Sequence, residues 1–221
     1  MISVIIPVKN GSNYLQEAIE SVLRQGVPVE ILVIDDGSTD NTVEIASGLG
    51  CKVISHPASK GQVAAKNTGL KAATGEYVLF LDHDDIIREG ALASMYEMIE
   101  ADPDASAVQS MVKDFLSPEI ASMPGTTIRP EPYYGLFTGA ILIRKSVFDT
   151  IGFFSEDKRT GEIIEWQSRM DQNGFLIKKT GIVSTDRRIH NTNFGKTNKG
   201  DEYKDYASVL RQRLMMLRNK S

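Results

Sequence analysis

The first hundred residues alternate short apolar runs with longer segments of helical period. Residues 2–7 (ISVIIP) are mostly apolar, which is typical of a strand buried on both faces. In the segment that follows, apolar residues recur at the spacing of one helix face: Leu15, Ala18, Ile19, Val22 and Leu23. We expect Asn13 and Gln16 to form a capping box at the start of this helix, and Gly26 to form a left-handed cap after its end.

The alternation continues up to residue 100. Further strands are predicted at 29–35, 51–55 and 76–81. Further helices are predicted at 42–49, 62–73 and 91–99. Because strands that alternate with helices are joined by right-handed crossovers, this order predicts an α/β fold with a mostly parallel sheet and helices on both faces.

The pattern is less regular beyond residue 110. Four of the eight prolines fall within 114–137, which we expect to be an ordered loop. It is followed by an apolar segment, two helices and a strand, predicted at 138–143, 145–151, 161–173 and 175–183. Residues 187–200 are polar and contain glycine, so a mobile loop is expected there, and 201–221 has the apolar stripe of an amphipathic helix.

Composition narrows the class of protein. The chain has 221 residues, 41% of them hydrophobic, and a formal net charge of −4, which is typical of one soluble globular domain. Without a long basic run, a nucleic-acid binder is not expected. Cys51 is the only cysteine, which excludes an internal disulfide and a thiolate zinc cage. No apolar stretch approaches the roughly 20 residues of a membrane span, and the first residues do not resemble a signal peptide, so a cytoplasmic location is expected.

Carboxylates and turn residues gather where three predicted strands end, at 7–10, 35–38 and 82–85. Ligands of open parallel sheets bind at the carboxyl ends of the strands, so we expect these loops to be neighbours. The last of them, Asp82-His83-Asp84-Asp85, places three carboxylates in four residues. Such groups repel one another unless a divalent cation neutralises them, and oxygen ligands with one imidazole suit Mg²⁺ or Mn²⁺ more than zinc. The alternative is an acidic turn in solvent or a helix cap.

Three segments in this order and spacing carry a resemblance: ISVIIPVKN, VIDDGSTDNT and KGQVAAKNTGLKAATGEYVLFLDHDD. They resemble the N-terminal half of the family 2 inverting glycosyltransferases of the GT-A fold, over about residues 2–100. The resemblance implies a nucleotide-sugar donor, favouring a UDP-sugar, a divalent cation (Mn²⁺ or Mg²⁺), and transfer with inversion to a hydroxyl of a saccharide, lipid-linked or protein acceptor. It also implies a single GT-A domain, with a donor-binding half (1–110), an acceptor-side half with the mobile loop (111–200) and the terminal helix (201–221).

The same resemblance implies roles for single residues. Pro7 would line the base and ribose pocket, and Asp36 would bind the uracil or ribose. Asp82 would face the ribose or a metal-bound water, and Asp84 would bind the metal. Lys66 stands where the family usually has arginine, which keeps a positive charge for the nucleotide but loses the bidentate fork.

Each of these residues also has a purely structural interpretation. Pro7 could simply end a strand, and Asp36 could make an Asx-turn with the residues after it. For Asp85 we favour a cap on the next helix over a role in the site.

An inverting transfer requires a general base, usually a carboxylate. The resemblance places it in a Glu-Asp pair opening a helix, but the position of that aspartate is occupied by Ile163. Glu162 and Glu165 lie three residues apart on one face of the predicted helix, and either could be the base. The alternatives are a helix N-terminal charge for Glu162 and a surface pair with Arg169 for Glu165.

The loop at 187–200 supplies further candidates. Similar enzymes bring a histidine from a C-terminal loop to the metal or the diphosphate, which implies that role for His190. Arg187 and Arg188 could bind phosphate oxygens bidentately, although one of them could instead pair with a surface carboxylate.

The acceptor side is assigned from fewer signals. Thr138 and Gly139 resemble the small residues that let an acceptor approach the sheet. Trp166 could stack on a sugar ring or pack in the core.

Two other functions are compatible with the pattern. A nucleotidyltransferase shares the sheet and the metal site, although a glycine-rich phosphate loop after the first strand is missing. A non-catalytic nucleotide-sugar-binding module would explain Ile163. The helix at 201–221 could rest on an anionic membrane at its inner face through its basic residues, or pack on the domain or on a second subunit as a homo-oligomer.

Overall fold

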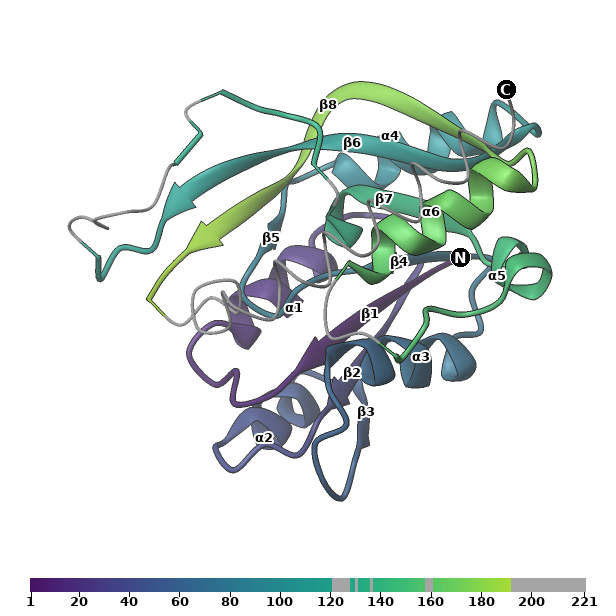
Figure 1. The fold of residues 1–221 in the computed structure, drawn as a ribbon. Helices are drawn as coiled ribbons and strands as arrows, with labels where there is room; N and C mark the ends of the chain where they lie inside the picture. Colours follow the sequence, from purple (N-terminus) through teal and green to yellow (C-terminus); the bar gives the residue numbers. More distant parts are fainter. Residues whose placement is uncertain (121–127, 130, 136, 158–160, 192–221) are drawn as a thin grey trace.

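The computed structural model describes residues 1–120, 128–129, 131–135, 137–157 and 161–191. These residues form one eight-stranded sheet with the strand order β3-β2-β1-β4-β7-β6-β8-β5 (Figure 1). Helices cover both faces of the sheet, as the alternation of apolar runs predicts.

The N-terminal half follows the predicted order. Its strands are β1 (Ile2–Val8), β2 (Val29–Asp35), β3 (Lys52–Ser55) and β4 (Tyr77–Phe80). Its helices are α1 (Leu15–Leu23), α2 (Thr42–Gly48), α3 (Gln62–Ala72) and α4 (Ala91–Glu100). β1 pairs in parallel with β2 and β4, and β2 pairs in parallel with β3. The carboxyl ends of four strands therefore lie along one edge, where the three acidic or turn-rich loops emerge.

Alternate residues of the central strands supply two separate cores. On one face, Ile2, Val4 and Ile6 of β1 pack in a cluster that includes α1 and α4. On the other face, Ile5 belongs to a cluster that includes α3 and the helices of the second half. A Cβ atom added to Gly69 of α3 would lie 2.3 Å from Cγ2 of Ile5, so this glycine lets the helix approach the sheet closely.

The remaining elements extend the sheet. They are the short strand β5 (Ile86–Ile87) between β4 and α4, then β6 (Ala105–Leu116), a 3₁₀ turn (Thr138–Ala140), β7 (Ile141–Arg144), α5 (Ser146–Ile151), α6 (Glu162–Gln172) and β8 (Leu176–Ile189). β7 runs antiparallel to both β4 and β6, whereas the long strands β6 and β8 are parallel to each other. Figure 1 shows β6 and β8 side by side, extending beyond the rest of the sheet.

Three local predictions are wrong. Residues 114–116, expected to begin a loop, end β6, because they pair with β8. Residues 187–189, expected to begin a mobile loop, are the last residues of β8 for the same reason. The capping box of Asn13 and Gln16 does not form: Tyr14 holds the N-cap position of α1 without a side-chain cap hydrogen bond. Gly26 does adopt the expected left-handed conformation, with φ +68°.

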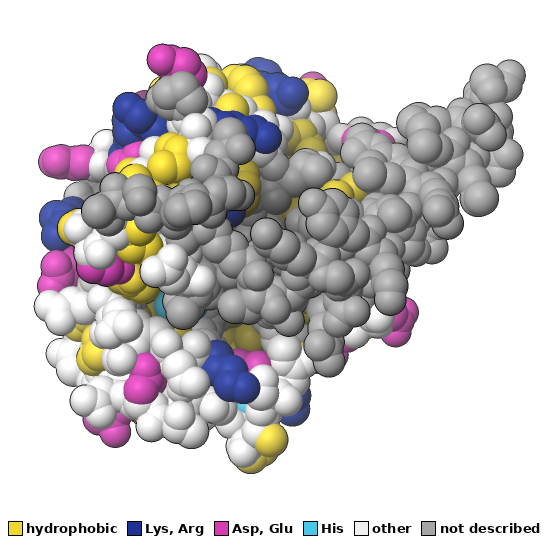
Figure 2. Space-filling model, turned by 60° about the vertical axis from the view of Figure 1, so that its left-hand side comes forward, with side chains coloured by type: hydrophobic (Ala, Val, Ile, Leu, Met, Phe, Trp, Pro, Cys, Tyr) yellow, Lys and Arg dark blue, Asp and Glu magenta, His cyan; other side chains and the backbone are white. Residues whose placement is uncertain are grey.

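The predicted loop at 192–200 and the predicted helix at 201–221 lie outside the described residues. Their structure and a membrane or subunit contact through them therefore stay predictions. None of the helices in the described ranges has the length and the hydropathy that a membrane crossing requires. On the face shown in Figure 2, acidic and basic side chains are interspersed over the coloured part of the surface.

Candidate active site

An acidic cluster forms the turn between β4 and β5. Carboxylate oxygens of Asp82, Asp84 and Asp85 lie within 4.8 Å of one another. The backbone N–H of Asp85 donates to the carbonyl of Asp82 (3.1 Å), which closes the turn directly after the buried strand β4. The three side chains thus converge at the ligand-binding edge of the sheet, as expected for this motif.

The last residues of β8 reach this turn. Nε2 of His190 lies 2.7 Å from Oδ2 of Asp84, and both side chains are largely buried. The ring of Tyr14 lies against the ring of His190, with centroids 4.8 Å apart. His190 was expected near the metal on the basis of the resemblance, and the structure brings it to the expected carboxylate.

Burial and mutual repulsion govern the acidic cluster. Burial raises the pKa of Asp82, and the nearby charge of Asp84 raises it further, whereas Lys66 opposes both effects. Burial together with the charges of Asp84 and Asp82 raises the pKa of Asp85 well above its usual value. Burial also disfavours the charge on Asp84, but the hydrogen bond with His190 brings its pKa below the usual value. Three carboxylates in this space resist full ionisation without a cation.

The donor set of the cluster fits a divalent cation. Asp82, Asp84 and Asp85 offer carboxylate oxygens within one small volume, and the imidazole of His190 lies within hydrogen-bond distance of Asp84. Hard oxygen ligands with one imidazole suit Mg²⁺ or Mn²⁺.

A second chain of contacts leads from Asp82 to α6. Nε2 of Gln62 donates to Oδ1 of Asp82 (2.9 Å). Nζ of Lys66, one turn further along α3, donates to Oε1 of Glu162 (2.7 Å), and both side chains are at most one-tenth exposed. Gln62 and Lys66 lie four residues apart on one face of α3, so the buried ion pair lies one helix turn from the side chain that binds Asp82. The charge of Lys66 lowers the pKa of Asp82, and the charge of Glu162 raises it. Lys66 thus contacts a glutamate here, whereas a nucleotide contact was expected.

The structure separates the two glutamates considered as the base. Glu165 accepts from Nε and Nη2 of Arg169, at 2.8 and 2.9 Å, which is the surface pair considered as its alternative. Arg169 is anchored in turn to the carbonyl of Phe153 (2.7 Å). Ile163 is buried in the core between the helices and the sheet. Glu162 is therefore the member of this helix turn whose carboxylate borders the acidic cluster.

Trp166 lies in the core. Its side chain is fully buried, stacks on Phe148 with centroids 4.7 Å apart, and donates from Nε1 to the carbonyl of Gly152 (3.3 Å). An acceptor sugar has no access to a ring in this position. Of the two alternatives considered for Trp166, the structure shows the core.

Asp36 is surrounded by donors from its own domain. Its two oxygens accept from Nδ1 of His56 (2.7 Å), Oγ of Ser59 (2.6 Å), and the backbone N–H groups of Lys60 and Gly61 (both 2.8 Å). Burial disfavours the charge, but these hydrogen bonds lower the pKa of Asp36 below its usual value. The Asx-turn considered for Asp36 does not form: the N–H of Ser38 donates instead to Oδ1 of Asp35, three residues earlier (2.9 Å).

Arg187 and Arg188 lie in β8 and contact protein groups. Nη1 of Arg187 lies 3.6 Å from Oδ1 of Asp114, and its guanidinium lies over the ring of Phe137. Nε of Arg188 donates to the backbone carbonyl of Asp84 (2.9 Å). Phosphate binding by Arg187 stays a prediction. Arg188 is almost completely buried, so its guanidinium has little room for a phosphate.

Asp85 does not cap a helix. The next helix, α4, begins at Ala91 with Gly90 at its N-cap. Oδ1 of Asp85 instead accepts the backbone N–H of Arg188 (2.9 Å), so the end of β8 is tied to the acidic turn. The favoured cap prediction is therefore wrong, and the cause is a long-range pairing that the local sequence does not contain.

The remaining predicted residues line the same edge. Pro7 lies in β1 beyond the last residue that pairs with β4, opposite Ile34 of β2. Thr138 is buried, and the carbonyl of Gly139 accepts from Oγ1 of Thr185 (2.7 Å). Gly139 lies between the end of β4 and β8, near Phe80, Leu81 and Thr185. The acceptor-side role of Thr138 and Gly139 stays a prediction.

A family model decides the class of the chain. Residues 3–159 match the model described as glycosyl transferase family 2. The chain belongs to this family. The match includes the acidic turn, Lys66 and Asp36, but ends before Glu162 and His190. Family 2 membership thus agrees with the resemblance of the N-terminal motifs.

Similar proteins include several named glycosyltransferases. Glycosyltransferase GlyG of Streptococcus pneumoniae is 38% identical over 114 residues, which cover 49% of this chain and 38% of GlyG. An uncharacterized glycosyltransferase of Haemophilus influenzae is 41% identical over 98 residues, which cover 42% of this chain and 39% of the relative. The matched part thus spans less than two fifths of the length of these two relatives. The Rickettsia prowazekii glycosyltransferase RP339 is 27% identical over 97% of this chain and 72% of its own.

Solved structures share the fold. TarS 1-349 of S. aureus, in complex with UDP-GlcNAc, matches with a TM-score of 0.75 at 22% identity, over 96% of this chain and 65% of TarS 1-349. A mannosyltransferase of Pyrobaculum calidifontis, in complex with GDP-Man and Mn²⁺, matches with a TM-score of 0.68 at 20% identity, over 87% of this chain and 58% of the other. These matches confirm the α/β fold expected of a GT-A domain.

Several residues of this family 2 chain enter the site without a sequence signal. Gln62 binds Asp82, His56 binds Asp36, and Tyr14 contacts His190. His56 and Tyr14 lie outside the three segments that carry the resemblance. Gln62 lies within the third segment, at the start of a helix, and this position could have suggested its role.

Proposed function

We propose that this chain is a metal-dependent inverting glycosyltransferase that moves a sugar from a nucleoside diphosphate donor, favouring a UDP-sugar, to an acceptor hydroxyl. The observation that carries the proposal is the acidic cluster: three carboxylates within 4.8 Å, met by His190, directly after β4 of a family 2 domain. The structures of TarS with UDP and UDP-GlcNAc support a uridine donor, and the mannosyltransferase with GDP-Man and Mn²⁺ supports a divalent cation.

A bound Mn²⁺ or Mg²⁺ would stabilise the negative charge that develops on the departing diphosphate. Asp84 and His190 would hold this ion, with Asp82 and Asp85 beside them. Asp36 and Pro7 would lie beside the nucleotide, at the carboxyl ends of β2 and β1.

Glu162 is the favoured base of this proposal. Its carboxylate would accept the proton of the acceptor hydroxyl as the oxygen attacks the anomeric carbon and the bond to the diphosphate breaks. The ion pair with Lys66 holds the Glu162 carboxylate against α3, one helix turn from Gln62, which binds Asp82. Glu165, committed to Arg169 in this structure, is the less favoured of the two. Thr138 and Gly139 would border the acceptor.

The first test is transfer or hydrolysis of a UDP-sugar with and without Mn²⁺ or Mg²⁺. Activity should require the cation and be lost in Asp84→Ala. Asp104→Ala, which removes an exposed carboxylate after α4, is the matched control and should retain activity. Metal-independent activity, or full activity of Asp84→Ala, would contradict the proposal. Release of pyrophosphate from a nucleoside triphosphate would favour a nucleotidyltransferase.

A further inference from the structure

Arg188 connects the end of β8 to the acidic turn by its side chain and by its backbone. Nε donates to the carbonyl of Asp84 (2.9 Å), and the backbone N–H donates to Oδ1 of Asp85 (2.9 Å). Nη2 pairs with Glu17 of α1. Arg188 thus connects Asp84 and Asp85 of the acidic cluster to helix α1.

The surroundings of the guanidinium are unusually closed for an arginine. Its carbon lies 4.7 Å from the ring centres of both Tyr14 and Phe115, and the residue is only 3% exposed. Burial of a guanidinium is costly unless hydrogen bonds and a counter-charge compensate for lost water. Here the carbonyl of Asp84 and the carboxylate of Glu17 supply these partners.

This geometry does not suit a phosphate ligand. To reach a diphosphate bidentately, the guanidinium would have to leave the carbonyl of Asp84 and Glu17, and move out from between two rings. In its present position it acts on the turn that carries the carboxylates. Three carboxylates in this volume repel one another, so a turn without such support would relax toward wider spacing.

We infer that Arg188 is a positioning residue for the metal site: it holds the Asp84–Asp85 turn so that three carboxylates converge on one cation. The inference rests on the proposed metal-dependent function. Groups that orient metal ligands in this indirect way typically contribute about 10- to 100-fold to metal affinity.

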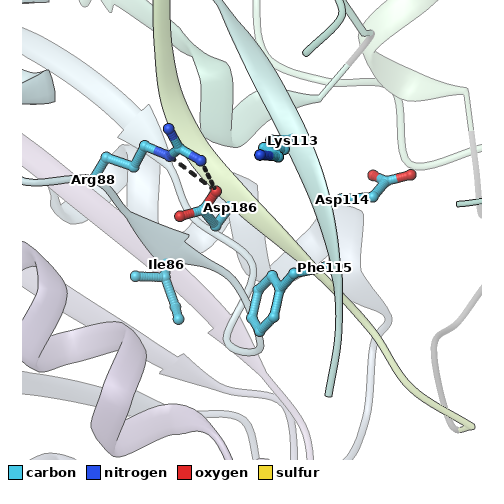
Figure 3. Close-up of a pocket in the computed structure, with 6 residues that line it drawn as sticks. All are labelled: Ile86, Arg88, Lys113, Asp114, Phe115 and Asp186. Atoms are coloured by element: carbon cyan, nitrogen blue, oxygen red, sulfur yellow. Dashed lines mark hydrogen bonds and ion pairs between the residues drawn. The ribbon is translucent and has the colours of Figure 1, made fainter. Parts of the chain in front are cut away.

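The same sheet offers a matched control. Arg88, directly after β5, donates from Nε and Nη2 to Oδ1 of Asp186 in β8 (2.9 and 2.6 Å). This pair lines a cavity of about 340 Å³ together with Ile86, Lys113, Phe115 and Asp114. Figure 3 shows the Arg88–Asp186 pair on one side of the strands and Asp114 pointing away from it. Within the part of the chain that the structure describes, the Arg88 side chain thus joins the end of β5 to β8 through Asp186, with no hydrogen bond to the carboxylates of the acidic cluster.

The test uses calorimetric titration of Mn²⁺ into the UDP-bound full chain, with Arg188→Met, Arg188→Lys and Arg88→Met. Methionine suits the aromatic surroundings, and Glu17 is half exposed, so no buried charge is left unpaired. The dissociation constant for Mn²⁺ should rise about 10- to 100-fold in Arg188→Met. It should rise less in Arg188→Lys, which keeps the charge but loses the planar fork, and stay unchanged in Arg88→Met. UDP affinity without metal should stay unchanged in all three.

Wild-type Mn²⁺ affinity in Arg188→Met would overturn the inference. Weaker metal-free UDP binding with unchanged Mn²⁺ affinity would assign Arg188 to the phosphates instead. An equal loss in Arg88→Met would indicate a general effect on the sheet. If the wild-type chain takes up no Mn²⁺, the proposed function itself fails, and this is seen before any variant is compared. If Arg188→Met does not fold, the Mn²⁺ dissociation constant of Arg188→Lys is compared with those of the wild type and Arg88→Met. A value equal to that of the wild type would then overturn the inference.

Discussion

Glu162 and Glu165 are separated by less than one turn of α6, yet they pair with different residues. Glu162 pairs with the buried Lys66 beside the acidic cluster, whereas Glu165 pairs with Arg169. The spacing of the two residues predicts a shared helix face and leaves both open as the base. Only the long-range partner, 96 residues away for Glu162, separates them.

We expect Glu162→Gln to lower the rate constant of transfer about 100- to 10,000-fold, because a general base contributes in that range. Donor affinity should be retained, because the carboxylates of the acidic cluster are unchanged. Glu165→Gln is the matched control and should stay near the wild-type rate. Product formation and donor binding are measured in parallel; equal losses in the two variants would contradict the assignment. Donor binding without turnover in the wild type would favour a non-catalytic module.

The sequence motif identifies Asp36 as a candidate site residue but does not predict its hydrogen-bond partners. The DDGS segment marks the residue, but its four donors come from His56 and the loop at 59–61, which no local pattern connects to it. In this structure the carboxylate fixes that loop next to the carboxyl end of β2.

Asp36→Asn should lower the free energy of unfolding by about 1–3 kcal/mol at pH 7, because an amide leaves buried N–H donors without an acceptor. The pKa of Asp36 is lower in the folded than in the unfolded chain. Its charge therefore stabilises the fold above the unfolded pKa of about 4, and this contribution is lost as the pH falls through the folded value.

The difference between wild type and variant should accordingly narrow between pH 7 and pH 3 in urea denaturation. Asp104→Asn, at an exposed position, should have the same free energy of unfolding as the wild type at both pH 7 and pH 3. A difference that is constant with pH would show that the charge of Asp36 is not the cause.

Single elements explain which parts of the fold are predictable. β1, β2 and α3 carry their pattern in consecutive residues, and the structure places them within about one residue of the prediction. β6 and the end of β8 do not: β6 mixes buried polar with apolar residues, and Arg188 is buried by its bonds to Asp84 and Glu17. Their pairing depends on contacts between distant parts of the chain, so the sequence pattern predicts no strand at 105–113 and predicts loops at 114–116 and 187–189.

Helix α3 provides a test of the packing. Gly69→Ala should destabilise the chain by about 1–3 kcal/mol, because its Cβ would meet Cγ2 of Ile5 at 2.3 Å in a filled core. Gly48→Ala in α2 has no atom within 4 Å of the added carbon, and should stabilise the chain by up to about 1 kcal/mol. Thermal and urea unfolding of both variants measure this. An equal effect of the two substitutions would contradict the close approach of α3 to β1.

At the scale of the whole molecule, the curled sheet brings the two halves of the chain to one site. The family 2 motifs of residues 3–159 supply the acidic turn. From beyond that range, α6 supplies Glu162, β8 supplies Arg188, and the residue after β8 is His190. Sequence motifs predict the acidic turn, because the residues that form it lie together in a short segment of the family 2 pattern. The contacts of Glu162, Arg188 and His190 depend on the order of the strands in the sheet.

The most direct test of the site is calorimetric titration of UDP into the wild-type chain, with and without Mn²⁺. If the carboxylates of the β4–β5 turn hold a cation that binds the diphosphate, UDP should bind more tightly with Mn²⁺ than without it. Equal affinity under both conditions, in a chain shown to be folded, would contradict the assignment.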